Sequence, residues 1–501
     1  MDLANKRGLC SKKRWLSNSQ LTITNGSNEG ATVTKKLPTS MEGSTIPLIL
    51  CSLSLGLLII YVALDTRGTF RFGERHGFMH YGMLAEAFVS GQLHLKQQVD
   101  PDRLRSKDPL DPSTPHPYQF DLIIWNGKYY LSREPLPGLI RAVILYTTGF
   151  SLPTGVVVVT FAFGVLILLG SLLWLIRRMY FSESPIWMLV YTWLAFALSG
   201  TQLYIVGRPV VYNESDAVAC FFVLGGSTLL VYAFSGARRR LVTACFSGAC
   251  FGAAVASRAL LVLYPACFLV IFLIFAAIRR EPLTTTINWT LSFGGPVAFW
   301  VAVLLAYNYL RFGNPLDFGY SHVIVPTYRA YQYLTVGGHF FSWKHMPYQL
   351  YYYLISWPKI VGKFPYLRYP FGSLSVNDIY VVRELVCSVF LTMPVLLLSP
   401  PYLFLSRHIW PRYPLSLLLV FVGISCMAVL AALSAFYGSA ARYYYEFTPL
   451  LFVLAFCNLA VFWDGITTSP RRKTLVKIVL SLLFIGNVLM GLLLGLTGTM
   501  Y

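Results

Sequence analysis

Charged residues are scarce in this chain. Asp, Glu, Lys and Arg together make up 12% of the 501 residues, about half of their share in soluble globular domains, whereas apolar residues make up 56%. This composition excludes a soluble globular domain. Runs of about 20 mostly apolar residues recur along the chain, and each is long enough to cross the hydrocarbon core of a bilayer as a helix. The sequence therefore predicts an all-α, polytopic membrane protein.

Acidic residues are scarcer than basic ones, with 21 Asp and Glu against 40 Lys and Arg and a formal net charge of +19. A basic excess can indicate nucleic-acid binding. Here the basic residues gather at the ends of apolar runs, where they set membrane orientation, and in long loops, where they can attract anionic head groups or phosphate. We therefore predict a lipid bilayer as a partner and no nucleic acid.

Motifs for nucleotide, metal and haem binding are missing as well. The chain has no P-loop, and its eight histidines are too scattered to form a ligand set at standard spacing. Of the nine cysteines, Cys10 lies in the polar N-terminal tail and the others lie in apolar runs, so no disulfide framework is predicted for the loops. We predict no cofactor; a divalent metal is compatible with the sequence, although no pattern indicates one.

The apolar runs predict eleven membrane spans. Basic clusters such as Arg177–Arg178, Arg238–Arg240 and Arg471–Lys473 fall on the same side as the basic N-terminal tail. Because loops rich in Lys and Arg stay in the cytoplasm, we predict a cytoplasmic N-terminus and an external C-terminus. The predicted spans are 46–64, 154–176, 185–205, 216–236, 241–257, 259–278, 287–308, 384–405, 415–436, 449–464 and 478–497.

This assignment divides the chain into three regions. Residues 1–45 are polar and have no apolar core for a cleavable signal, so we expect a disordered, basic cytoplasmic tail. Residues 46–450 form the main transmembrane region, and residues 451–501 form the last transmembrane helices. Two connections, 65–153 and 309–383, are too long to be simple connectors, and both are predicted to be extracytoplasmic.

The long loops carry helix and turn patterns of their own. Apolar residues at helical spacing from Phe78 to Phe88 predict a helix on the membrane surface that ends near Gly91. Prolines exclude regular structure in residues 100–118, and Asn126–Gly127 predicts the turn of a β-hairpin. Two further surface helices are predicted, in residues 133–149 of the first loop and in residues 347–358 of the second.

Five motifs follow one another along the chain: LAEAFVSGQL (84–93), DLIIWNGKYY (121–130), RPVVYNESD (208–216), NYLRFGNPLDFGY (308–320) and GSAARYYYEFTP (438–449). In this order they resemble the motifs of GT-C glycosyltransferases, membrane enzymes that take a sugar from a polyprenyl-phosphate donor. The resemblance covers most of residues 46–450 and is nearest to prokaryotic GT-C-like membrane proteins and to the aminoarabinose and mannosyl transferase branch. It implies a transmembrane helical bundle of GT-C type with its catalytic region in residues 46–450.

Glycosyl transfer needs a carboxylate that accepts the proton of the acceptor hydroxyl. GT-C enzymes carry an Asp or an Asp/Glu pair just before the first surface helix, and His76 is the aligned residue here. Glu74, two residues upstream, is therefore our first candidate for the base; the alternative is a solvated carboxylate paired with Arg71 or Arg75. Asp121 is the second candidate catalytic acid, with capping of the hairpin as the alternative.

The departing phosphate needs cations, and arginine suits it because the guanidinium fork holds two oxygens at once. Arg258 is a single charge where two apolar runs meet at the predicted outer rim, which indicates function; snorkelling to the interface is the alternative. Glu214 has three readings: it positions Arg208, contacts the acceptor or only begins a helix. The predicted substrate-binding residues are His76, Lys128, Tyr129, Arg133, Arg208, Glu214, Arg258, Arg311 and Arg442.

The sequence thus predicts an inverting glycosyltransferase of the cell membrane with an extracytoplasmic active site. Its partners are a polyprenyl-phosphate sugar donor and the bilayer. The sugar, the prenyl length and the acceptor stay open, and the acceptor is a glycan, a lipid or a protein. The rival function is a transporter or flippase for a lipid-linked glycan, which would place ionisable residues and broken helices at mid-membrane.

Overall fold

Helices make up most of the fold in the computed structural model. The structure describes residues 42–73, 80–110, 122–235, 239–324, 341–364, 366–368, 375–376, 379–380, 386–400, 414–436, 438–466 and 470–500. The longer helices are α1 (Glu42–Asp65), α5 (Thr154–Tyr180), α6 (Ile186–Ala197), α7 (Gly200–Gly207), α8 (Val211–Phe234), α9 (Arg240–Ser257), α10 (Leu263–Arg279), α11 (Leu283–Phe312), α16 (Leu415–Ala435), α17 (Thr448–Ile466) and α18 (Pro470–Met500).

Among the described residues, seven helices are long and apolar enough to cross a membrane, or eight if the bent pair α6 and α7 is one span. The seven are α5, α8, α9, α10 together with the short 3-10 turn η1 (Ala259–Val262), α11, α16 and α18. The predicted class, an all-α polytopic bundle, is confirmed. The predicted number of eleven spans is not established by these helices.

Two predicted spans are not single helices. The predicted span 185–205 is broken at Leu198 and Ser199, and the two pieces are bent by 40°. The predicted span 384–405 contains only the short turns α14 (Val389–Thr392) and η3 (Pro394–Leu398) among its described residues. Pro394 lacks a backbone N–H and clashes with a preceding helical turn, which ends α14 although the segment is apolar enough to span.

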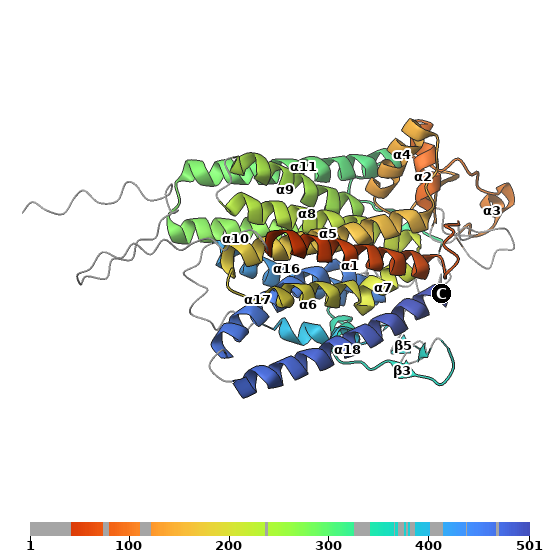
Figure 1. The fold of residues 1–501 in the computed structure, drawn as a ribbon. Coiled ribbons are helices and arrows are strands. Elements are labelled where there is room, and N and C mark those ends of the chain that lie inside the picture. The colour runs from red at the N-terminus through yellow and green to blue at the C-terminus, as the bar shows by residue number, and fades with distance from the viewer. Residues whose placement is uncertain are drawn as a thin grey trace, which may run out of the picture. The chain divides into compact units, whose positions relative to one another are not determined.

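The bundle is held together by close helix packing. In Figure 1, α8 lies between α5 and α9, and α9 runs beside α11; residue contacts join the same pairs, and α10 packs on α16. Gly248 of α9 faces the backbone of α11, and a Cβ at this position would overlap the carbonyl oxygen of Phe293. A glycine is therefore needed where these two spans meet.

The first long loop folds over one end of this bundle (Figure 1). Its elements are α2 (His80–Val89), α3 (Pro101–Arg105), β1 (Leu122–Trp125), β2 (Lys128–Leu131) and α4 (Leu136–Thr148). The predicted helices and the hairpin are confirmed: Trp125 pairs with Lys128 across the turn, and Asn126 and Gly127 both have positive φ. The prediction of no regular structure was wrong for α3, because Asp100 caps it and Pro101 suits the first turn.

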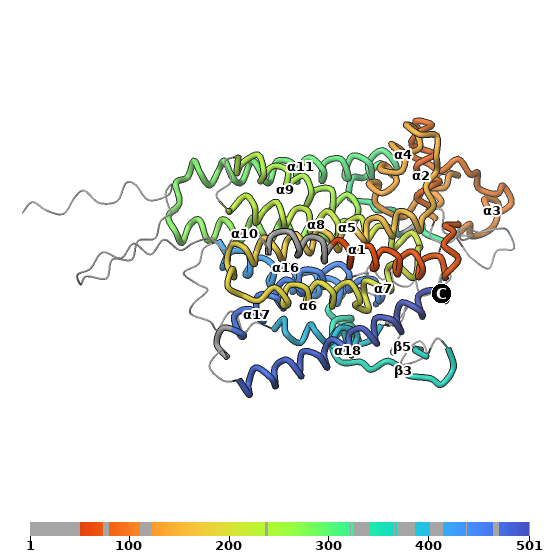
Figure 2. Tube along the Cα trace, viewed as in Figure 1, coloured from red at the N-terminus to blue at the C-terminus, as the bar shows by residue number. Residues whose placement is uncertain are grey.

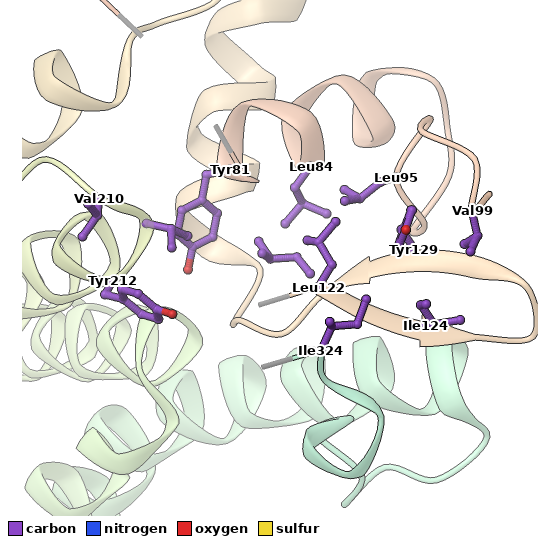
Figure 3. Packing of buried hydrophobic residues seen from close by; sticks show 12 residues of the cluster. Tyr81, Leu84, Leu95, Val99, Leu122, Ile124, Tyr129, Val210, Tyr212 and Ile324 are labelled. Carbon is purple, nitrogen blue, oxygen red and sulfur yellow. The ribbon is translucent and has the colours of Figure 1, made fainter. Parts of the chain in front are cut away.

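A hydrophobic cluster ties this loop to the bundle. Tyr81 and Leu84 of α2, Leu122 and Tyr129 of the hairpin, and Tyr212 at the start of α8 belong to one buried cluster. Figure 3 shows these side chains gathered between α2, the hairpin and the first turn of α8. The hairpin is thus a packed part of the fold, and it fixes the residues that follow it in the chain.

The second long loop carries α13 (Met346–Leu354) and two pairs of short antiparallel strands. The helix predicted in residues 347–358 is confirmed, although Tyr352 and Tyr353 are buried and only its other face is exposed. The strands are β3 (Lys359–Ile360), β4 (Leu367–Arg368), β5 (Ser375–Val376) and β6 (Ile379–Tyr380). Figure 2 shows the strand-bearing segment near the C-terminal end of α18, on which β4 packs.

Contacts along the chain define two units, Met1–Ser54 and Leu55–Tyr501. The described part of the first unit is the first half of α1, and the second unit contains all other described elements. The division into residues 1–45, 46–450 and 451–501 remains a prediction.

Candidate functional site

Charged side chains gather beneath the hairpin, at the end of the bundle that the first long loop covers. The residues of this ionic cluster come from the segment after β2, from α4, from the first two turns of α8, from the position just after α9, from the last turn of α11 and from the 3-10 turn η4 (Ala441–Glu446). Its members are Arg133, Glu134, Arg141, Glu214, Asp216, Arg258, Arg311, Arg442 and Glu446, with the rings of Tyr212 and Tyr443 among them.

One end of this cluster, which we call the paired end, contains Arg258 with the carboxylates of Glu446 and Asp216. The Arg258 Nε lies 2.8 Å from Glu446 Oε1 and 3.3 Å from Asp216 Oδ1, and its Nη2 lies 2.7 Å from the same Glu446 oxygen. The backbone of Arg258 is extended, so α9 stops here and the chain turns into η1. One guanidinium therefore joins three elements and is neutralised by two carboxylates.

Glu446 is held on both its backbone and its side chain. The Tyr264 hydroxyl donates to the Glu446 carbonyl at 2.7 Å, and the neighbouring Tyr445 hydroxyl donates to Gln202 Oε1 at 2.7 Å. Burial raises the pKa of the Glu446 carboxyl to about 7, whereas Arg258 acts in the opposite direction. The paired end is thus anchored to α7 and α10, and its charge balance depends on the Arg258 guanidinium.

A second buried ion pair lies between α4 and α8. Arg141 Nη1 is 3.0 Å from Glu214 Oε2 and 3.2 Å from Glu214 Oε1, and the same side chain donates to the carbonyl of Leu152. Both side chains are at most 2% exposed. This pair fixes α4 against the start of α8.

The ring of Tyr212 holds two more arginines of the cluster. The Cζ atoms of Arg133 and Arg442 lie over this ring, 4.3 and 4.2 Å from its centroid. Arg442 also lies 4.9 Å from the ring centroid of Tyr443. Guanidinium groups are attracted to aromatic faces, so the ring brings together one cation that follows the second sequence motif and one from the fifth.

The other end of the cluster, which we call the open end, is a narrow crevice lined by Arg133 and Arg311. Arg311 donates to the carbonyl of Leu131 at 2.9 Å and to Asn308 Oδ1 at 2.7 Å, and Gly313 in a left-handed conformation ends α11 just after it. The crevice is too narrow to hold a water molecule in this structure. Its lining residues are Ser132, Arg133, Glu134, Leu304, Asn308, Arg311, Phe318 and Tyr320.

Polar atoms at this crevice lack partners within the described part of the chain. Neither Arg133 nor Arg311 forms an ion pair there, and the Nε atoms of both are buried without a hydrogen bond. Glu134 accepts from the Ala259 N–H through Oε1 at 3.0 Å, whereas its Oε2 is buried without a hydrogen bond. Two guanidinium N–H groups and one carboxylate oxygen thus make no hydrogen bond among the described residues.

The structure brings together five of the predicted substrate-binding residues, namely Arg133, Glu214, Arg258, Arg311 and Arg442. Other predicted residues are placed differently. Arg208 ends α7 and donates to the Tyr204 hydroxyl at 2.9 Å, Tyr129 packs in the hydrophobic cluster, and Lys128 is exposed at the hairpin turn. Glu74, His76 and Asp121 lie outside the described residues.

Sequence reasoning missed Glu134, Arg141, Asp216 and Glu446 as members of the site. A signal was present for three of them, because Glu134 adjoins Arg133 and both Asp216 and Glu446 lie inside quoted motifs. Prolines 135 and 137 start α4 directly after Arg133 and Glu134, which fixes the two charges at a turn. Among the described residues, no group of three or more His, Cys, Asp and Glu side chains could hold a metal ion.

Solved structures with a similar course of the chain include two membrane proteins. One is an oligosaccharyltransferase from Archaeoglobus fulgidus in the apo form, which is 13% identical with a TM-score of 0.48; the match covers 89% of this chain and 56% of that chain. The archaeal oligosaccharyltransferase AglB from the same organism, in complex with an inhibitory peptide and a dolichol-phosphate, matches at 13% identity with a TM-score of 0.45 over the same shares of the two chains. The other is ArnT from Cupriavidus metallidurans bound to undecaprenyl phosphate (13%, TM-score 0.45, 91% and 77%).

No protein-family model and no curated protein sequence matches the chain. The chain spans only about half of the length of the archaeal oligosaccharyltransferase. The TM-scores of these matches lie below 0.5.

Proposed function

We propose that this chain is a membrane glycosyltransferase that moves a sugar, with inversion, from a polyprenyl-phosphate donor to an acceptor at the ionic cluster. The observation that carries the proposal is the meeting, in one buried site, of residues from the third, fourth and fifth motifs with Arg133, which follows the second motif. Arg133 follows the second motif, and Glu214, Arg311 and Arg442 lie in the third, fourth and fifth. Each contributes a charged side chain to the cluster, and the crevice between them has unpaired guanidinium donors.

Phosphate binding suits the open end of the cluster. A phosphate accepts charge-assisted hydrogen bonds, which are stronger than neutral ones, and arginine can offer two at once. Arg133 and Arg311 line the crevice without carboxylate partners among the described residues, and Arg442 shares the Tyr212 ring with Arg133. These three arginines hold the donor phosphate in our proposal and stabilise the negative charge that grows on it as the sugar leaves.

The proposed base takes a proton from the acceptor hydroxyl while that oxygen attacks the anomeric carbon of the sugar. The bond between this carbon and the phosphate oxygen breaks, and the electron pair leaves with polyprenyl phosphate. Glu74 is our first candidate for the base and Asp121 the second, as the sequence motifs indicate. Glu134 is a third candidate, because its Oε2 is buried in the crevice between the two arginines and accepts no hydrogen bond.

The test follows polyprenyl phosphate release by the purified protein in lipid vesicles that contain a labelled polyprenyl-phosphate sugar. Replacing the base by its amide keeps the shape but removes proton acceptance, so turnover should fall by roughly 10²–10⁴-fold with donor binding nearly unchanged. Glu74→Gln, Asp121→Asn and Glu134→Gln are compared side by side. The variant with this signature identifies the base, and full activity in all three would refute carboxylate catalysis at this site.

One feature supports the rival function of a flippase for a lipid-linked glycan. The bent pair α6 and α7 is a broken helix of the kind that transporters use. Its break at Leu198 and Ser199 contains no ionisable side chain, however, and the charges lie at the end of the bundle. Movement of the labelled lipid across vesicles without any release of polyprenyl phosphate would establish the rival and exclude the transferase.

A further inference from the structure

The second long loop exposes many aromatic side chains to the outside of the fold. We define the interface segment as residues 341–364 and 366–368, which contain α13, β3 and β4. Trp343 is 86% exposed, Trp357 is 71% exposed and Ile360 is 74% exposed. Large apolar side chains at this exposure are unfavourable in water, at about 25 cal/mol for each Å² left uncovered. Other exposed members are Phe341, Tyr348, Tyr351, Ile355, Phe364 and Tyr366.

The charge of the interface segment has one sign. Lys344, Lys359 and Lys363 are all exposed, and the segment contains no Asp or Glu. Hydrophobic surface alone would fit many partners, whereas tryptophan, tyrosine and lysine together are typical of the boundary between lipid and water. Lysine side chains there reach the head groups while their aliphatic stems stay in the apolar layer.

The position of the segment on α18 places it at that boundary. Leu367 of β4 is buried against Leu494 of α18. Leu494 lies five residues before Thr499, where the candidate membrane span in α18 ends, and this separation is about 8 Å at 1.5 Å per residue. The nearby α18 side chains Leu492 and Leu496 are 39% and 36% exposed. The segment is thus attached near the end of an apolar helix that is long enough to span a membrane.

The other face of the same segment is an ordinary packed surface. Gln349 and Tyr353 of α13 are buried, the Gln349 amide donates to the Phe436 carbonyl at 3.2 Å, and the Ser388 N–H donates to the Ser356 carbonyl at 2.7 Å. The segment is thus fixed to the end of α16 on one side. Its exposed rings and lysines therefore lie on a segment whose backbone is held in place by packing and hydrogen bonds.

We propose that the interface segment binds the bilayer surface, with Trp343, Trp357 and Ile360 inserted among the lipids and Lys359 and Lys363 on the head groups of anionic phospholipids. The segment lies at the same end of the bundle as Arg208, because Gly498 of α18 packs beside that residue. The proposal does not depend on the glycosyltransferase function.

Insertion is tested by tryptophan fluorescence of the full chain in vesicles of brominated phosphatidylcholine. Bromine quenches only lipid-embedded rings, so Trp343→Phe and Trp357→Phe should each lower the quenched fraction of the total emission. Trp125→Phe is the matched control, since Trp125 lies in the hairpin of the first loop; its removal should raise the quenched fraction. An unchanged or raised fraction in both segment variants would overturn the proposal.

Varying the ratio of protein to lipid shows whether lipid or a second copy of the chain covers the interface segment. If the two tryptophans become protected from acrylamide only as the ratio of protein to lipid rises, a second copy covers the segment and the proposal is wrong. Protection that is independent of this ratio supports it. Unchanged melting temperatures of both variants ensure that a shift in quenching does not come from unfolding.

Selectivity for anionic lipid is tested with spin-labelled phosphatidylglycerol in phosphatidylcholine vesicles. Each lysine near an anionic surface contributes enough attraction for an about fivefold preference. Lys359→Gln with Lys363→Gln should therefore lower the preference for phosphatidylglycerol over phosphatidylcholine by roughly 25-fold. Lys107→Gln, an exposed lysine in the first loop, is the control and should have no effect. An equal preference in the double variant and the wild type would refute the electrostatic part of the proposal.

Discussion

The two ends of the ionic cluster satisfy their charges in different ways. At the paired end, Arg258 contacts two carboxylates within 3.3 Å. At the open end, Arg133 and Arg311 rest on aromatic rings and a backbone carbonyl, and within the described residues they have no carboxylate partner. A charge neutralised inside the protein supports the fold, whereas a charge without a partner is available to a ligand. The same residue type therefore serves structure at one end and binding at the other.

Removing Arg258 should have the largest effect on stability. Arg258→Met leaves Glu446 and Asp216 buried without a cation, and the loss of one partner from a buried ion pair costs about 3–5 kcal/mol. Denaturation of the purified protein in detergent measures this loss. Adding Glu446→Gln and Asp216→Asn to the same chain removes the unpaired charges and should recover most of it. A single variant as stable as the wild type would show that the paired end does not support the fold.

Removing Arg133 should affect binding more than stability. Hydrogen bonds to a charged group contribute about 1.5–3 kcal/mol, so Arg133→Ala should weaken the binding of polyprenyl phosphate by roughly 10–100-fold. The stability of this variant should change little, because Arg133 forms no ion pair among the described residues and its guanidinium lies over the Tyr212 ring. Titration calorimetry with polyprenyl phosphate measures the affinity. Arg105→Ala, in an exposed ion pair with Asp102, is the control and should leave both properties unchanged.

The paired end should also make stability depend on pH. The pKa of Glu446 is raised to about 7 in the folded chain from 4.5. The folded state therefore holds this proton more tightly than the unfolded state, and the resulting stability is complete below about pH 4.5 and is lost as the pH rises through about 7. Melting temperatures in detergent across this range measure the slope. Glu446→Gln should flatten it, and an unchanged slope in that variant would assign the dependence to another group.

Local features of the fold were predictable from the sequence because they depend on neighbouring residues. Asn126–Gly127 predicts the hairpin since both residues tolerate positive φ, and the apolar spacing around Leu84 predicts α2. The predicted span 384–405 is not a single helix in its described part, because Pro394 interrupts the backbone hydrogen bonds and hydropathy averaged over a window does not register this.

The site was predictable in composition but not in pairing. Five predicted residues do meet in the ionic cluster, since a buried arginine at the end of a span needs a partner or a function. Which carboxylate pairs with which arginine depends on how distant helices pack: Glu446 and Arg258 are 188 residues apart, and Arg141 and Glu214 are 73 apart. Sequence patterns report periodicity within an element, and these contacts lie between elements.

Tyr212 lies where the two ends of the cluster meet, and its replacement should have the smallest effect. Tyr212→Leu removes the ring that holds the guanidinium of Arg133, a contact worth about 0.5–2 kcal/mol, so the affinity for polyprenyl phosphate should fall by up to roughly 30-fold. Tyr212→Phe keeps the ring and should bind like the wild type. A double-mutant cycle with Arg133→Ala separates the ring contact from other effects: if the ring acts by holding Arg133, then Tyr212→Leu should weaken binding little further once Arg133 is gone. Full additivity of the two replacements would mean that Tyr212 acts on the ligand in another way, and that the open end is not organised by this ring.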